Sequence, residues 1–136
     1  MLYPLFAMVL LTLVVGIIAL RSRIASVKSG KLDVRYFRNM QAREGTTVPE
    51  RVVITTRCFN NQFEVPVLFY TASVAALALD QVSIYTLLLG WGFVISRCAH
   101  AWIHLTYNNV FHRMNAYWVG IVFMLALWIE QIVKSQ

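Results

Sequence analysis

The first twenty residues of the chain, 1–20, contain no charged side chain and are mostly Leu, Val, Ile, Met and Ala. An apolar α-helix of about 20 residues spans the hydrocarbon core of a bilayer. A secretory signal peptide has basic residues before its apolar run, whereas here Arg21 and Arg23 follow it. We therefore expect this run to remain in the mature protein as a membrane span.

The composition agrees with a membrane protein. Hydrophobic residues make up 59% of the chain and charged residues 13%, with a mean hydropathy of +0.62. Soluble domains have roughly 45–50% apolar and about 25% charged residues. These values argue against a soluble globular domain, a disordered tail and a disulfide-stapled secreted protein. The length predicts one domain, residues 1–136.

Three further uncharged runs follow, at 65–79, 82–96 and 116–129. A 15-residue helix covers only about 22 Å of the roughly 30 Å hydrocarbon core, so each helix must continue through polar neighbours. We expect an all-α integral membrane protein, a four-transmembrane-helix up-down bundle. The expected spans lie at about 1–21, 57–79, 82–107 and 113–133.

Positive charge gathers between the first two spans. Residues 21–57 contain nine Lys and Arg against three Asp and Glu, so this segment accounts for the whole formal net charge of +6. The positive-inside rule predicts that the loop at about 22–56 is cytoplasmic. A multi-pass protein of a bacterial inner membrane or the endoplasmic reticulum fits this pattern. Nothing else in the chain resembles a nucleic-acid-binding module, so we expect no nucleic-acid partner.

Alternating helix directions place the polar ends of all four spans on the side of the basic loop, and both termini on the other side. On the side of the basic loop, three sets of polar residues have helical spacing, so that each set lies on one face of its helix. The sets are Arg57, Asn61 and Glu64; Arg97, His100, His104 and Tyr107; and Arg113 and Tyr117. Ionisable groups at membrane depth usually face the bundle interior or a wet cavity. Since Glu64 is the one acid among mostly cationic groups, we expect a cavity for an anionic ligand that also carries an amine.

Each set also has a purely structural interpretation. Arg57 and Glu64 could form a salt bridge at a helix end. His100 and His104 could form hydrogen bonds between helices, or they could ligate a metal or haem. A zincin motif has a carboxylate directly after its first histidine, and none follows His100, so we assign no metal. Arg113 could anchor the helix at the membrane surface, or hold a thiolate or carboxylate by charge-assisted hydrogen bonds.

Two motifs resemble a known family. Arg57-x3-Asn61-x2-Glu64-x-Pro66 resembles the signature of the MAPEG family, membrane-associated proteins in eicosanoid and glutathione metabolism. Arg97-x2-His100, followed by Arg113 and Tyr117, resembles the microsomal prostaglandin E synthase branch of that family, close to the microsomal glutathione transferases. The resemblance covers nearly the whole chain.

The resemblance implies a homotrimer that binds glutathione between neighbouring protomers. By matching position, the residues implied to contact glutathione are Arg57, Asn61, Glu64, His100, Arg113 and Tyr117, with Arg21 and His104 as further candidates. Glu64 would bind the γ-glutamyl amine and the arginines the carboxylates. Arg113 would stabilise the thiolate and is the expected catalytic residue.

Three positions depart from the prostaglandin branch: Asn60 replaces an arginine, His104 a tyrosine and Met114 a serine. We therefore do not expect isomerisation of a prostaglandin endoperoxide. The predicted function is a glutathione transferase or peroxidase acting on lipophilic electrophiles from the bilayer. Two alternatives remain: a non-catalytic lipid-binding or scaffold protein of the same fold, and a small channel or transporter subunit whose buried charges line a pathway.

Overall fold

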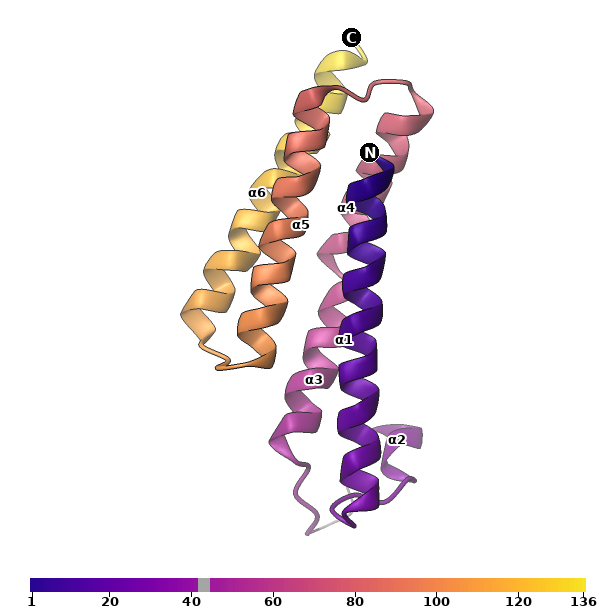
Figure 1. The fold of residues 1–136 in the computed structure, drawn as a ribbon, viewed down its shortest axis with the longest axis vertical. Coiled ribbons are helices and arrows are strands. Elements are labelled where there is room, and N and C mark those ends of the chain that lie inside the picture. Colours follow the sequence, from indigo (N-terminus) through magenta and orange to yellow (C-terminus); the bar gives the residue numbers. More distant parts are fainter. Residues whose placement is uncertain (42–44) are drawn as a thin grey trace.

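The computed structural model describes residues 1–41 and 45–136, and in this part of the chain all regular secondary structure is helical (Figure 1). The elements in chain order are α1 (Leu2–Lys28), α2 (Tyr36–Asn39), α3 (Glu50–Asn60), η1 (Asn61–Phe63), α4 (Val65–Ala78), α5 (Ile84–Leu105) and α6 (Val110–Lys134).

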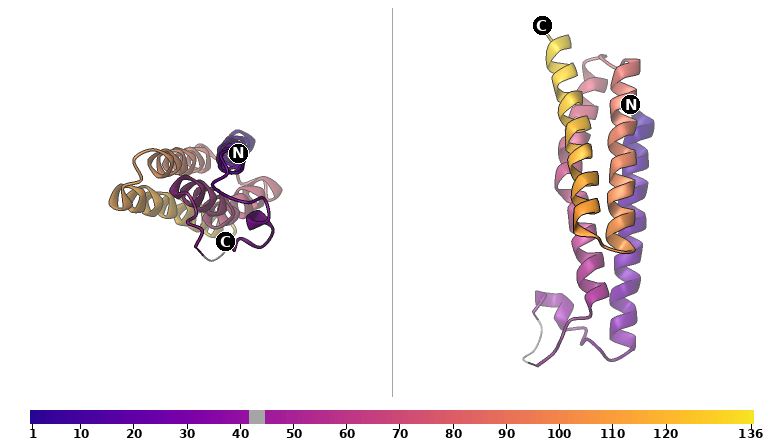
Figure 2. Two further views of the ribbon diagram at one scale, coloured as in Figure 1. Left: turned by 90° about the horizontal axis from the view of Figure 1, so that it is seen from below. Right: turned by 90° about the vertical axis from the view of Figure 1, so that its left-hand side faces the viewer.

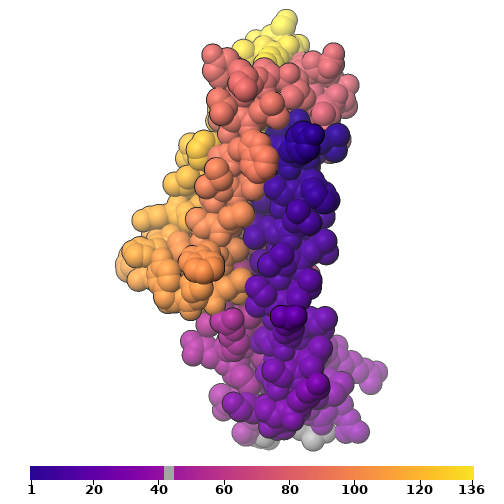
Figure 3. All heavy atoms as spheres, viewed as in Figure 1, coloured from indigo at the N-terminus to yellow at the C-terminus, as the bar shows by residue number. Residues whose placement is uncertain are grey.

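The long helices run side by side along one axis (Figures 1 and 2). α5 packs most extensively against α6, while α1 contacts both α3 and α5. Both termini and the α4–α5 connection lie toward one end of the molecule. The lower parts of α1 and α3 extend past the α5–α6 connection, and α2 lies beside them at the opposite end. The space-filling view shows the resulting elongated shape, with α1 lying against α5 in the upper half (Figure 3).

Among the described residues, three helices, α1, α5 and α6, are long and apolar enough to cross a membrane. Their positions correspond to three of the four predicted spans. At the remaining one, 57–79, the structure has α3 and α4 joined by the η1 turn instead of one helix. Pro66 lies in the first turn of α4, where its missing N–H group costs no hydrogen bond, so the break falls just before it.

The hydrophobic core lies where α1, α4, α5 and α6 meet. The Phe69 and Phe93 rings stack with centroids 4.4 Å apart, and Met8 and Leu127 are fully buried beside them. Many large apolar side chains instead point outward along the same helices, for example Phe111 with 71% of its surface exposed. Exposed apolar side chains in this number suit a lipid or protein environment.

α5 and α6 approach closely because small residues lie between them. A Cβ atom at Gly120 would lie 2.7 Å from the Ser96 Oγ, and one at Gly92 would collide with the Phe123 ring. Small residues at such contacts let helix backbones approach in membrane proteins. This pairing fixes the spacing between the two helices that carry most of the predicted site residues.

A polar cluster joins the opposite ends of the same two helices. Ser83 caps α5 through a capping box with Thr86. Glu130 of α6 accepts hydrogen bonds through its Oε1 from the Ser83 Oγ at 2.7 Å, the Thr86 Oγ1 at 2.9 Å and the Lys134 Nζ at 2.5 Å. The start of α5 is thereby held against the end of α6.

Candidate functional site

The break between α3 and α4 shapes one wall of the candidate site. Glu64, between η1 and α4, has φ −98° and ψ −102°, which is not a helical conformation. Its side chain is exposed, whereas the neighbouring Gln62 is buried. A continuous helix would give Glu64 helical dihedral angles, so the break sets where its carboxylate points.

Arg97 stabilises this break from inside the bundle. Its guanidinium is fully buried, and Nη2 donates a hydrogen bond of 3.1 Å to the backbone carbonyl of Asn61. A helix break frees backbone carbonyls, and at membrane depth these must be satisfied within the protein. The guanidinium carbon also lies 5.6 Å from the centroid of the Tyr117 ring, a cation–π contact that ties η1 to α6.

Two Arg97 donors, Nε and Nη1, are buried without a hydrogen-bond partner. Arg97 also interacts electrostatically with Glu64 and Cys58. The structure therefore places a positive charge directly behind the wall formed by Asn61 and Tyr117. An anion in front of that wall would experience this charge as well as those of its direct contacts.

Arg113 is positioned by the turn between α5 and α6. Asn108 adopts a left-handed conformation with φ 48°, and its Oδ1 accepts a hydrogen bond of 2.7 Å from the Arg113 Nη1. Asn109 caps α6 by accepting from the His112 backbone N–H at 3.1 Å. Arg113 thus lies one turn into α6 with one side of its guanidinium occupied and the rest available to a ligand.

These features meet in an open groove with a volume of about 340 Å³. Its lining residues are Asn61, Glu64, His100, Val110, Arg113, Met114 and Tyr117. The groove, hereafter the polar groove, combines one carboxylate, one guanidinium, an amide, an imidazole and a phenol. Five predicted site residues from three separate segments of the chain are therefore brought together.

Three predicted site residues lie outside the polar groove. His104 is buried behind it, with its ring 5.7 Å from that of His100. Arg57 is exposed in the last turn of α3, and Arg21 is exposed on α1. In the described part of the chain, neither arginine forms a hydrogen bond or an ion pair.

Sequence reasoning missed Val110 as a lining residue and Asn108 as the partner of Arg113. The double Asn108-Asn109 could have indicated a tight turn with left-handed backbone. Met114, noted only as a departure from the prostaglandin branch, lies in the groove itself. Within residues 1–41 and 45–136, no group of three or more His, Cys, Asp or Glu side chains could hold a metal ion.

Comparison with known proteins gives one match. The family model described as the MAPEG family matches residues 1–133 of the 136-residue chain. Neither the curated proteins nor the solved structures contain a match.

Proposed function

Because the chain belongs to the MAPEG family, we propose that this integral membrane protein binds glutathione in the polar groove and is a transferase or peroxidase for lipophilic electrophiles. The observation that carries the proposal is the meeting of Glu64, Arg113 and Tyr117 in one groove. Glutathione carries two carboxylates, one ammonium and one thiol. The groove combines one carboxylate with one guanidinium, and the buried Arg97 adds a second positive charge behind its wall, which together complement this pattern.

The roles follow from the chemistry of each side chain. Glu64 accepts hydrogen bonds from the γ-glutamyl ammonium, while Asn61 and His100 offer polar contacts along the tripeptide. Arg113 has guanidinium donors left over from its bond to Asn108 and binds the sulfur. A neighbouring cation favours the thiolate, which is the nucleophilic form of a thiol.

The reaction is an attack by this thiolate. In the transferase reaction, the sulfur forms a C–S bond with an electrophilic carbon, and the displaced electron pair leaves on the leaving group or opened ring. In the peroxidase reaction, the sulfur attacks the terminal hydroperoxide oxygen and breaks the O–O bond, which releases the lipid alcohol and leaves a sulfenic acid. A second glutathione then attacks the sulfenic sulfur and gives the disulfide and water. Arg113 remains protonated and stabilises the anion before attack.

The same proposal includes four membrane spans and a homotrimer. The α3–η1–α4 column is the remaining span, and the basic loop faces the cytoplasm. The polar groove is open along one side of the protomer, and Arg57 and Arg21 lie exposed outside it. In a trimer, these arginines come from the neighbouring protomer and bind the carboxylates of glutathione. His104, being buried, supports His100 from behind.

Turnover by purified protein tests the chemical step. Detergent-solubilised protein is incubated with glutathione and either a lipophilic chloronitroarene or a lipid hydroperoxide, and conjugate or disulfide is quantified. We expect turnover that falls at least about tenfold in Arg113→Gln, since a charge-assisted hydrogen bond contributes about 1.5–3 kcal/mol. Arg38→Gln, an exposed arginine of α2, is the matched control. Glutathione binding without turnover on either substrate class would contradict catalysis and favour the non-catalytic alternative.

A further inference from the structure

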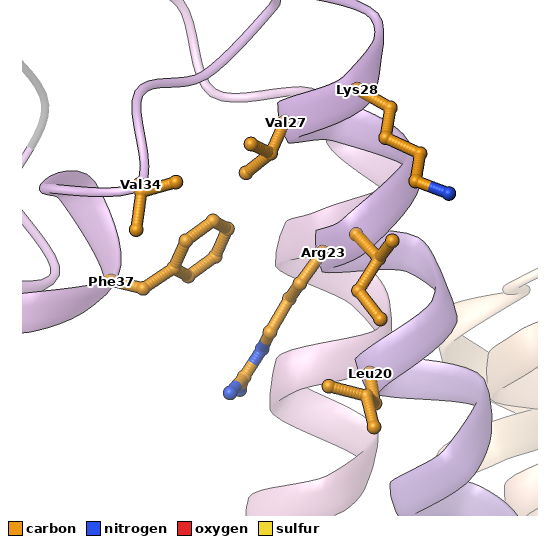
Figure 4. Close-up of a pocket in the computed structure, with 7 residues that line it drawn as sticks. Leu20, Arg23, Val27, Lys28, Val34 and Phe37 are labelled. Carbon is orange, nitrogen blue, oxygen red and sulfur yellow. The ribbon is translucent and has the colours of Figure 1, made fainter.

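A second recess lies at the opposite end of α1 from the N-terminus, away from the polar groove. It has a volume of about 460 Å³ and is formed by the last two turns of α1 and the segment that leads into α2 (Figure 4). Its apolar lining includes Leu20, Ile24, Val34 and Phe37. Arg23 and Lys28 are the two cationic side chains in the lining. We call this feature the α1 recess.

Arg23 is unusual among the basic residues of this region because it is partly buried. Figure 4 shows its side chain extending between Phe37 and Leu20. The guanidinium carbon lies 5.8 Å from the centroid of the Phe37 ring, and Nη2 donates to the Thr56 Oγ1 at 3.3 Å. Its Nε is buried with no hydrogen-bond partner. In the described part of the chain, no carboxylate pairs with this guanidinium.

The height of the recess along α1 matches a lipid headgroup. Residues 1–20 are uncharged, and about 20 helical residues cross the hydrocarbon core. Arg23 follows Leu20 by three residues, about 4.5 Å farther along the helix axis. The recess therefore extends from the end of the apolar span into the headgroup layer, with Leu20 at the edge nearer the hydrocarbon core and Lys28 at the edge farther from it.

We propose that the α1 recess binds an anionic phospholipid. The lipid phosphate accepts hydrogen bonds from the free donors of Arg23, and one acyl chain lies along Leu20 and Ile24. Lys28 and the surrounding basic segment favour a headgroup with net negative charge over a zwitterionic one. A second copy of this chain that meets the recess through the same surface is the poorer occupant, since this two-fold contact would bring like charges together.

Native mass spectrometry of the detergent-purified full-length protein tests this site. The protein is titrated with phosphatidylglycerol or with phosphatidylcholine of the same acyl chains, and the Kd of the first bound lipid is measured. We expect at least about tenfold tighter binding of phosphatidylglycerol, because both lipids offer a phosphate but only phosphatidylglycerol has a net negative charge, and Arg23 and Lys28 each favour that charge by about fivefold. Millimolar inorganic phosphate should not displace it, because the acyl chain contributes to binding.

Two arginine variants separate a specific site from general surface charge. Loss of one basic residue near a membrane surface costs about fivefold in affinity for anionic lipid. Arg38→Gln, in α2 but outside the recess, should show at most this effect. Arg23→Gln should bind phosphatidylglycerol at least about tenfold more weakly than Arg38→Gln, because the phosphate also loses its hydrogen bonds.

A second recess variant avoids dependence on the folding of Arg23→Gln. Ile24→Glu places a carboxylate on an exposed position of α1, where it should abolish the preference for phosphatidylglycerol without disturbing the core. The proposal is overturned if the two lipids bind equally to the wild-type protein, or if Ile24→Glu retains the preference. It is also overturned if Arg23→Gln and Arg38→Gln agree within about threefold, or if the recess variants change only the oligomer mass.

Discussion

At the residue scale, the polar groove depends on two arginines with different roles, the buried Arg97 and the half-buried Arg113. Arg97 is enclosed, bonds the Asn61 carbonyl and lies over Tyr117, so it maintains the wall. Arg113 faces the groove and is oriented by Asn108. The positive charge behind the wall and the one within the groove act on the same ligand position.

The role of Arg113 predicts a spectroscopic change. In Arg113→Gln, the fraction of bound glutathione present as thiolate should fall at least about tenfold, because one charge-assisted hydrogen bond is lost. Arg113→Lys keeps the charge and should retain an intermediate fraction. The ultraviolet absorbance of the thiolate, recorded on saturated protein, measures this. Equal thiolate absorbance in the wild-type protein and in Arg113→Gln would rule out the assigned role.

At the element scale, the pairing of α5 with α6 holds the site together. Its two ends are fixed by different means, by the polar cluster around Glu130 at one end and the Asn108–Arg113 bond at the other. Close approach in between depends on Gly92 and Gly120. Changes at this interface should therefore affect stability first and the groove second.

Gly120→Ala should destabilise the protein. The new Cβ would lie 2.7 Å from the Ser96 Oγ, and overpacking of this kind costs about 1–3 kcal/mol. Unfolding midpoints in a denaturing detergent give the change. In the Ser96→Ala background the collision disappears, so the same substitution should become neutral or stabilising, because alanine favours helix over glycine. The interface account fails if Gly120→Ala has the same effect in both backgrounds.

Ser83→Ala should lower stability by about 1–2 kcal/mol, since it removes the cap of α5 and one donor to Glu130. Ser135→Ala is the control, because its hydroxyl bonds only the nearby Ile132 carbonyl at the end of α6. Urea or detergent unfolding of the two variants measures the difference. Comparable stability of Ser83→Ala and Ser135→Ala would show that the polar cluster does not hold the helix ends together.

The sequence predicted the helical class, the family and four spans, three of which correspond to candidate spans in the described part of the chain, because long uncharged runs and helical spacing are local signals. It also grouped five of the seven residues that line the polar groove, together with Arg21, Arg57 and His104, which lie outside it. The η1 turn was harder to predict from the sequence. Pro66 indicated a kink, but the non-helical conformation of Glu64 depends on the hydrogen bond from Arg97 to the Asn61 carbonyl, a contact across 36 positions. The left-handed Asn108 and its bond to Arg113 depend likewise on how α5 and α6 meet.

At the scale of the whole molecule, the chain exposes apolar side chains and a polar groove that a soluble monomer would bury. The polar groove is open, the long helices present large apolar side chains, and Arg57 has no hydrogen-bond or ion-pair partner among the residues that the structure describes. Lipid accounts for the apolar surface alone. The proposed assembly of identical protomers would account for the open groove and the unpaired arginine together.

Shared sites predict complementation between inactive protomers. If each glutathione site takes Arg57 from one protomer and Arg113 from the next, Arg57→Ala and Arg113→Ala should each be inactive alone. Co-expressed in equal amounts and randomly mixed in a cyclic trimer, they should restore about a quarter of the sites. Turnover of the purified mixed assemblies measures this. Activity no higher than that of the single variants would contradict a site built from two protomers.

The central claim, that the polar groove binds glutathione, is tested most directly by the thermal stability of the detergent-purified protein across a glutathione titration. A ligand at about 100 times its Kd adds roughly 2.7 kcal/mol to stability. We predict a saturable rise in melting temperature that is lost in Glu64→Gln and retained in Glu50→Gln, an exposed carboxylate at the start of α3. No rise at millimolar glutathione, or an equal rise in both variants, would contradict the account.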